Sequence, residues 1–164
     1  MRQFTDPPVP ALTSARSGPR LAVRAVIVHR GRLLVVNAWP GQASDLWCVP
    51  GGGVERGASL HDSLHREVME ETGLQIAIGA PCLVNEFHDP ATDFHQVEIH
   101  FRATLIGGAQ VGTPADPAGV VDRRRWVSEA TLPGLRFKPD SLPAIAFGPP
   151  GQAPLHDPLE PILR

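Results

Sequence analysis

Residues 66–74 read Arg66-Glu67-Val68-Met69-Glu70-Glu71-Thr72-Gly73-Leu74, a stretch dense in glutamate. The three glutamates stand at positions i, i+3 and i+4, so on a helix their Cβ atoms are neighbours about 5–6 Å apart. At about 100° per residue, Glu67 and Glu71 fall on the apolar stripe of this helix, whereas Glu70 falls beside it. Carboxylates at the boundary of a core need compensation. The pattern favours a bound cation; the alternative is an acidic surface helix with Glu–Arg pairs.

We expect the helix to occupy residues 59–72. Ser59 is a suitable N-cap with Asp62 three residues later, and Gly73 suits the position after the last turn. The preceding loop, Pro50-Gly51-Gly52-Gly53, allows the backbone to approach a ligand closely. It is not a P-loop, because no Gly-Lys-Ser/Thr follows. Loop and helix together predict a site for a hard divalent cation with oxygen ligands, as Mg²⁺ prefers.

These residues resemble the signature of the Nudix hydrolases, which runs Gly, five residues, Glu, seven residues and then Arg-Glu-aliphatic-x-Glu-Glu-x-Gly-aliphatic. Gly52 opens the signature and residues 66–74 complete it at the required spacing; the lead-in, residues 46–55, is also similar. One position departs, because the first glutamate of the signature falls on Ala58. That residue is mainly structural in the family, so we expect the three metal ligands to remain intact. With the flanking strands, the resemblance extends over residues 21–147.

The resemblance implies a fold, a reaction and a set of ligands. The fold would be a Nudix-type α/β/α sandwich, with a mixed sheet and the acidic helix packed on it. The reaction would be hydrolysis of a nucleoside diphosphate linked to another group, by water that Mg²⁺ or Mn²⁺ activates. The metal ligands would be Glu67, Glu70, Glu71 and the Gly51 carbonyl, and Arg66 would orient the glutamates. A non-catalytic Nudix-fold domain that binds a nucleotide or nucleotide sugar is the alternative function.

The rest of the chain is organised as one domain between two polar ends. We expect a flexible arm at 1–19, the Nudix domain at 20–148 and a Pro-rich tail at 149–164. The alternative for the tail is attachment to a surface through its apolar residues, Leu155, Leu159, Ile162 and Leu163. Within the domain, the patterns predict the following elements: a hairpin of 21–28 and 33–36 with a turn at Gly31-Arg32, strands at 74–78, 82–87, 95–106 and 120–127, and a second helix at 139–147.

Relatives often take a further carboxylate from outside the signature as general base or ligand. Glu98 lies in the alternating stretch 95–106, on the face of His100 and Arg102, and it is our first candidate. Asp122, shortly before Trp126, is the second. Glu98 is alternatively a solvated strand residue, and Asp122 alternatively pairs with a neighbouring arginine. Glu86 and Asp116 are weaker candidates.

Other residues are candidates for metal or substrate contacts. His61 and His65 have the i, i+4 spacing of a zinc-protease motif, but the residue after His61 is Asp rather than Glu, so surface histidines are the better interpretation. Trp39 is the preferred residue to stack on a base, ahead of Trp47 and Phe87. Arg124 is a candidate phosphate contact, with a solvated strand edge as the alternative.

Composition limits the partners of the chain. A formal net charge of −2 over 164 residues argues against a long nucleic acid or an anionic membrane as partner. No apolar run approaches the roughly 18 residues of a membrane span, and the first eight residues show no signal peptide. Two cysteines cannot form a disulfide framework, which favours the reducing cytoplasm. We therefore expect a small nucleotide-type substrate and consider a homodimer as a further assembly.

Overall fold

The computed structural model describes residues 18–107 and 119–164. Its first element is the predicted hairpin, formed by β1 (Arg20–His29) and β2 (Arg32–Asn37). The turn lies one residue earlier than predicted, at Arg30 and Gly31, whose φ angles are 50° and 71°. Two successive positive φ angles are typical of the tight turn that matches the twist of an antiparallel pair.

The acidic helix, α1, spans Leu60–Thr72, close to its predicted bounds. The Ser59 hydroxyl accepts a hydrogen bond from the Asp62 amide, which satisfies a helix N–H that would otherwise lack a partner. At the other end, the Gly73 N–H donates to the Met69 carbonyl in the left-handed conformation that glycine tolerates (φ 69°). Both predicted capping residues are therefore confirmed.

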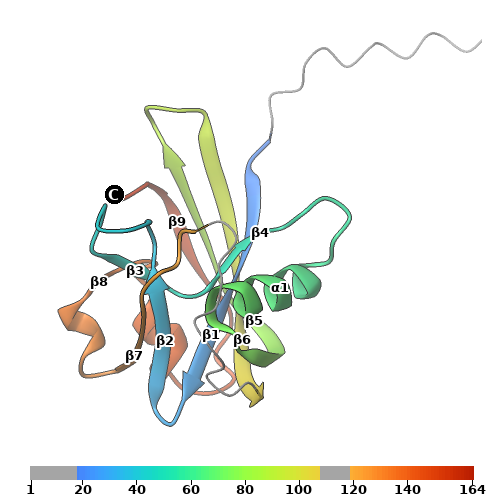
Figure 1. Cartoon of the computed structure of the whole chain (residues 1–164), viewed down its shortest axis with the longest axis vertical. Helices are drawn as coiled ribbons and strands as arrows, with labels where there is room; N and C mark the ends of the chain where they lie inside the picture. Colours follow the sequence, from blue (N-terminus) through green and yellow to red (C-terminus); the bar gives the residue numbers. More distant parts are fainter. Residues whose placement is uncertain (1–17, 108–118) are drawn as a thin grey trace, which may run out of the picture.

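Within the described residues, nine strands form one curled sheet at the centre of the fold (Figure 1). Its main order is β8-β3-β2-β1-β6-β5-β9, with β4 paired to β1 and β7 paired to β2. The remaining strands are β3 (Leu46–Cys48), β4 (Gly51–Gly53), β5 (Gln75–Asp89), β6 (Phe94–Gly107), β7 (Arg124–Ser128), β8 (Arg136–Phe137) and β9 (Leu155–Pro161). Because β1 runs parallel to β6 and antiparallel to β2, the sheet is mixed.

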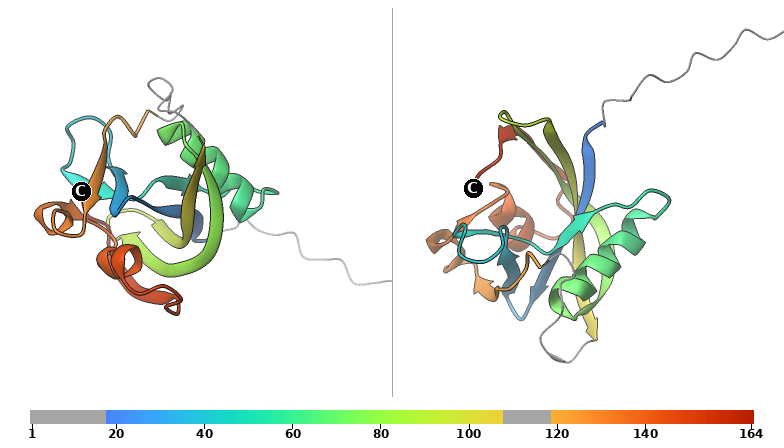
Figure 2. Two further views of the ribbon diagram at one scale, coloured as in Figure 1. Left: turned by 90° about the horizontal axis from the view of Figure 1, so that it is seen from below. Right: turned by 45° about the horizontal axis from the view of Figure 1, so that its top comes forward.

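The two faces of β1 contact two separate cores. Val23, Ala25 and Ile27 pack with Leu64 and Val68 of α1. On the opposite face, Val26 packs in a cluster that includes α2 (Leu142–Phe147), near the short 3₁₀ helix η1 (Leu132–Gly134). Helices therefore cover both faces of the sheet, as the two views of Figure 2 also show, and the expected α/β/α sandwich is confirmed.

Some predicted elements have different bounds. The glycine stretch 51–53 is not a loop: it forms β4, in register with residues 22–24 of β1. The strands expected at 74–78 and 82–87 form one strand, β5, whose register shifts near Pro81. The last predicted strand begins at Arg124 rather than at residue 120, and α2 begins at Leu142 rather than at 139.

The expected Pro-rich tail is the largest difference. Leu155–Pro161 forms β9, which runs parallel to β5 at the edge of the sheet (Figure 1). Prolines are tolerated on an edge strand, because one side of the strand needs no donor. The N-terminal arm lies almost wholly outside the described residues, and Asp116 also lies outside them. Within the described residues, no helix is both long enough and apolar enough to cross a membrane.

Candidate active site

A cavity of about 710 Å³ lies beside the junction of α1, β4 and β1. Glu67 and Glu71 of α1 line it together with the three glycines of β4. Glu98 lines it from β6, and residues 160–164 line it from the C-terminal segment. Residues far apart in the sequence, from both sides of the Nudix-like signature, thus meet at one cavity.

Glycines fix the acidic helix to β4. The Gly51 N–H donates to Glu71 Oε2 at 2.8 Å, in a buried position where Glu71 is 8% exposed. Gly51 has φ 141°, and a Cβ there would lie 2.1 Å from the Val23 carbonyl oxygen. A Cβ on Gly52 would lie 2.5 Å from the Glu67 carboxylate. Glycine is therefore required at position 51, where a side chain would clash with backbone, whereas a side chain at position 52 would displace the Glu67 carboxylate from its place beside β4.

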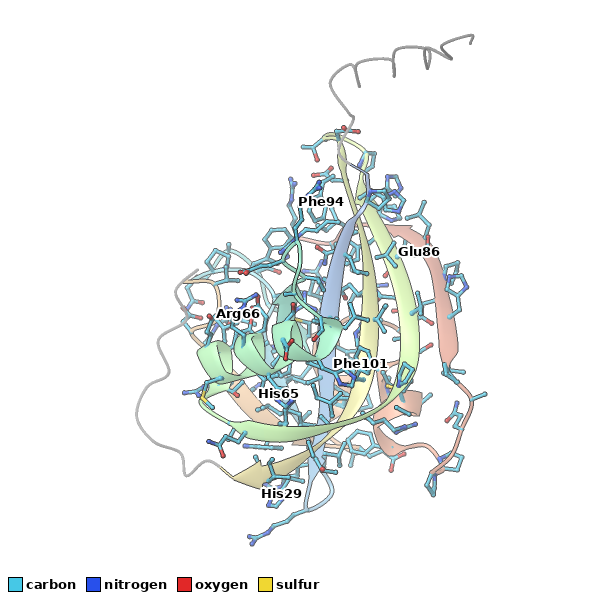
Figure 3. The ribbon with its side chains drawn as sticks, turned by 90° about the vertical axis from the view of Figure 1, so that its right-hand side faces the viewer. His29, His65, Arg66, Glu86, Phe94 and Phe101 are labelled. Atoms are coloured by element: carbon cyan, nitrogen blue, oxygen red, sulfur yellow. The ribbon has the colours of Figure 1, made fainter. Side chains whose placement is uncertain are left out.

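Arg66 contacts the carboxylate groups of Glu67 and Glu70. Its guanidinium donates to Glu67 Oε1 at 2.8 Å and to Glu70 Oε2 at 3.0 Å. Figure 3, in which α1 crosses in front of the sheet, shows where Arg66 lies on the helix. These contacts agree with the expected orienting role of Arg66, and they neutralise part of the like charge that would otherwise destabilise the helix.

The glutamate carboxylates of α1 and the Gly51 carbonyl offer only oxygen ligands, and oxygen is the ligand atom that a hard divalent cation prefers. Glu67 and Glu71 line the cavity, whereas Glu70 does not, and Arg66 contacts both Glu67 and Glu70. Within residues 18–107 and 119–164, no three acidic, imidazole or thiol side chains form a preassembled metal cluster.

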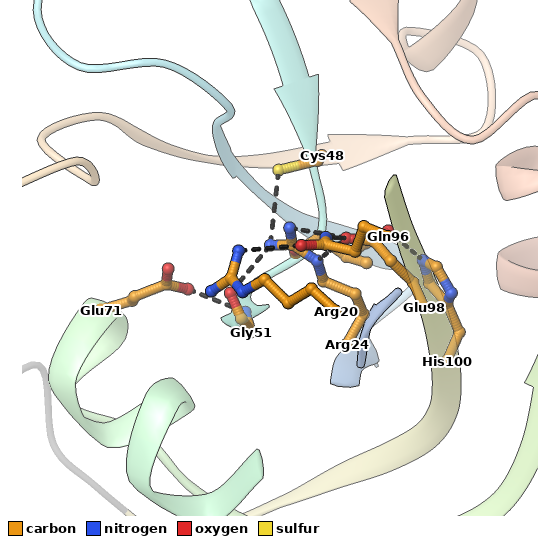
Figure 4. Close-up of polar contacts among 9 residues, drawn as sticks. Arg20, Arg24, Cys48, Gly51, Glu71, Gln96, Glu98 and His100 are labelled. Atoms are coloured by element: carbon orange, nitrogen blue, oxygen red, sulfur yellow. Dashed lines mark hydrogen bonds and ion pairs between the residues drawn. The ribbon is translucent and has the colours of Figure 1, made fainter. Parts of the chain in front are cut away.

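Glu98 is held in a buried network that Figure 4 shows. Its Oε1 accepts from Arg24 Nε at 2.9 Å and from Gln96 Nε2 at 2.8 Å. Burial by itself raises the pKa of Glu98, but the charge of Arg24, the neighbouring His100 and the hydrogen bonds from Arg24 and Gln96 together outweigh burial, so the pKa lies below its ordinary value. Glu98 is 5% exposed, which excludes the alternative that it is a solvated strand residue.

Arg24 also links Glu98 to the glycine strand. Its Nη1 donates to the Gly51 carbonyl at 2.8 Å, the carbonyl expected to bind metal. Our sequence reasoning missed Arg24. The sequence feature that could have indicated Arg24 is its position as the single charge in the apolar run of residues 22–28. A charge in a buried strand requires a partner of opposite charge.

The remaining candidates lie in different surroundings. The Asp122 side chain is 52% exposed, lies 3.5 Å from Arg123 Nε, and is not among the residues that line the cavity. Arg124 donates to the Thr72 carbonyl at the end of α1 and does not line the cavity either. Trp39 does line it: its Nε1 donates to the Leu163 carbonyl at 2.9 Å, and the Arg164 guanidinium lies 5.9 Å from the ring centroid.

Several weaker candidates are accounted for by local contacts. Glu86 pairs with His156 at 2.8 Å, and His61 packs edge-on against Phe101. His65 is exposed on α1, and Ala58 is exposed in the loop before it. Trp47 is 7% exposed in the core, as expected for a packing residue. Cys48 and Cys82 are both free thiols.

Comparison with known proteins places this arrangement in a family. A family model of the NUDIX domain matches residues 18–146. A Bacillus subtilis protein named as a candidate 8-oxo-dGTP diphosphatase is 32% identical over 88 residues, and the match spans 54% of each protein. The ADP-ribose pyrophosphatase of Methanocaldococcus jannaschii is 28% identical over 127 residues, 76% of this chain and 70% of that protein.

The fold has solved counterparts. The crystal structure of a UDP-X diphosphatase superposes with a TM-score of 0.64 at 23% identity, covering 88% of this chain and 70% of that one. At this identity the superposition establishes the fold, and the family model supplies the relationship of sequence over most of the chain. The chain therefore belongs to the Nudix hydrolase family.

Proposed function

We propose that the chain is a divalent-metal-dependent hydrolase that cleaves the diphosphate of a nucleoside diphosphate linked to another moiety. The observation that carries the proposal is the convergence of Glu67, Glu71 and the ionised Glu98 on one cavity. Family membership adds weight, because the relatives above carry the names diphosphatase and pyrophosphatase.

The residues of α1 and β4 would hold the metal. Glu67, Glu70, Glu71 and the Gly51 carbonyl offer the oxygen ligands, and Mg²⁺ or Mn²⁺ bound there would neutralise phosphate charge and lower the pKa of water. The Gly51 carbonyl also accepts from Arg24, and a carbonyl oxygen has two lone pairs, so the two roles are compatible. Arg66 would keep the carboxylates oriented.

Glu98 is our proposed proton acceptor. Its Oε1 is occupied by Arg24 and Gln96, whereas Oε2 lies 4.0 Å from Nε2 of the buried His100, too far for a hydrogen bond. Because Arg24 keeps the carboxyl ionised, Oε2 is ready to accept a proton from attacking water. Asp122 is a weaker candidate, since it lies outside the cavity lining.

A non-catalytic nucleotide-binding domain is the second candidate function. It is favoured by one observation: Arg66 already pairs with Glu67 and Glu70, as it would in a domain that needs no metal. Metal binding separates the two functions, because only the hydrolase requires the cation.

The surroundings of the reaction are part of the proposal. The two free thiols suit a reducing compartment, and we propose the cytoplasm. With a net charge of −2, a small nucleotide substrate suits the chain better than a long nucleic acid or a membrane. A homodimer also remains part of the proposal.

A product-release screen tests the function. The panel contains ordinary and oxidised nucleoside triphosphates, ADP-ribose, nucleotide sugars and dinucleoside polyphosphates, each with Mg²⁺ or Mn²⁺. We expect at least one substrate to be hydrolysed and EDTA to abolish the reaction. Nucleotide binding without hydrolysis of any panel member would support the binding domain instead.

A further inference from the structure

The side-chain oxygen of Asn85 is buried and has no hydrogen-bond partner in the part of the chain that the structure describes. Asn85 lies on β5 and is 3% exposed, and its Oδ1 is buried without a donor. A buried polar group in this state destabilises a protein. An amide that serves packing alone would be replaced without loss by an apolar residue, so its presence points to a ligand.

Asn85 belongs to the wall of the cavity. Asn85 lines it, and so does Phe87, two residues further on the same face of β5. Phe94 lines the cavity from the neighbouring strand β6, with its ring centroid 6.0 Å from that of Phe87. Figure 3 shows Phe94 near the end of the β5–β6 hairpin. We name Asn85, Phe87 and Phe94 the amide–aromatic patch.

The chemistry of this patch suits an uncharged, planar group. A side-chain amide presents a donor and an acceptor side by side, and so does the hydrogen-bonding edge of a nucleobase. Phenyl rings offer flat surface for a base to pack on. None of the three residues carries a charge, so the patch suits a neutral base better than a phosphate.

The C-terminal segment encloses this part of the cavity. Asn85 pairs in register with Asp157 of β9, and beyond β9 the Ile162 N–H donates to the His88 carbonyl. Glu160 and Leu163 line the cavity as well. All of this segment follows residue 146, where the match to the family model ends.

We propose that Asn85 binds the nucleobase of the substrate through its amide, with Phe87 and Phe94 packing on the base, in a subsite that β9 encloses. This inference rests on the proposed function, because it assigns the nucleoside end of the substrate to the patch and the diphosphate end to Glu67 and Glu71.

Replacement of Asn85 by leucine tests the inference. Leucine has a similar shape and no polar atom, so Asn85→Leu should leave the melting temperature of the ligand-free protein unchanged or raise it. Calorimetry with AMP, GMP, CMP, UMP and ribose 5-phosphate measures binding without any hydrolysis. For the nucleotide that the wild type binds most tightly, we expect the variant to bind about 10-fold or more weakly. Binding of ribose 5-phosphate should change less than about 2-fold, and Gln75→Leu, at the exposed start of β5, is the control.

Three results would overturn the inference. The first is unchanged nucleotide binding by Asn85→Leu, and the second is an equal loss for ribose 5-phosphate, which would assign the amide to the sugar. The third is a melting temperature lower by several degrees, which would show a structural partner. Failure of the proposed function would look different, because it would remove hydrolysis while leaving the effect of Asn85→Leu on AMP or GMP binding intact.

Discussion

Replacing Arg24 by methionine removes the charge that holds Glu98 ionised. The Arg24 side chain is 18% exposed and that of Glu98 is 6% exposed, with Arg24 Nη2 lying 2.8 Å from Glu98 Oε1. Removing one partner of such a buried pair leaves the other charge without compensation, which costs about 3–5 kcal/mol. We expect Arg24→Met to lower the free energy of unfolding by that amount at pH 8.

The loss should depend on pH. Without Arg24, burial raises the pKa of Glu98 above its unfolded value, so the folded variant takes up a proton that the unfolded chain binds less tightly. The stabilising effect of that proton is present at low pH and is lost as the pH rises. The difference in unfolding free energy between wild type and variant should therefore be smaller at pH 5 than at pH 8.

Urea unfolding at the two pH values measures these differences. Adding Glu98→Gln to Arg24→Met should recover part of the stability, because the unpaired charge is then gone. Arg20→Met, four residues earlier on β1, is the control: it loses a hydrogen bond to the neutral Gln96 and should cost about 1 kcal/mol. A loss below about 1 kcal/mol for Arg24→Met that is independent of pH would refute the assignment of the buried ion pair.

Three further predictions concern other groups near the site. Glu98→Gln should lower kcat by about 10²-fold or more with little change in KM, whereas Asp122→Asn should do less; the reverse ranking in steady-state kinetics would assign the base to the region of Asp122. Burial lowers the pKa of His100 from 6.5 to about 4, so the unfolded chain takes up the proton at a higher pH than the folded chain does. The unfolding free energy of the wild type should therefore fall by up to about 3 kcal/mol as the pH drops from about 6.5 to 4. In urea titrations, His100→Leu should flatten this pH dependence. Ala58→Glu should tighten Mn²⁺ binding or leave it unchanged in calorimetry, because the helix N-terminus favours an anion, and a clear loss of affinity would show a different site.

The parts of the fold that could be predicted are those with local causes. The bounds of α1 follow from Ser59 and Gly73, which act within one helical turn, and the inward placement of Glu67 and Glu71 follows from helical geometry. The alternation of residues 95–106 likewise predicted β6 and the common face of Glu98 and its neighbours.

The parts that could not be predicted depend on contacts across the chain. Arg24 and Glu98 are 74 positions apart, and only the parallel pairing of β1 with β6 brings them together. The sequence did not predict β9, because its prolines are typical of a tail. An edge strand nevertheless tolerates prolines, and β9 lies at the edge of the sheet. Asn85 carried no sequence signal at all, because its lack of a partner is visible only once β5 is placed beside the cavity.

Glu71→Gln provides the most direct test of the metal-dependent hydrolase. The amide oxygen of glutamine can still accept from the Gly51 N–H, so the fold should remain intact while the charge that a cation needs is lost. On the best substrate of the panel, we predict a kcat lower by about 10²-fold or more and weaker Mn²⁺ binding in calorimetry, with Glu129→Gln, an exposed glutamate outside the cavity, unchanged in both. Turnover and Mn²⁺ affinity close to those of the wild type in Glu71→Gln would contradict the account.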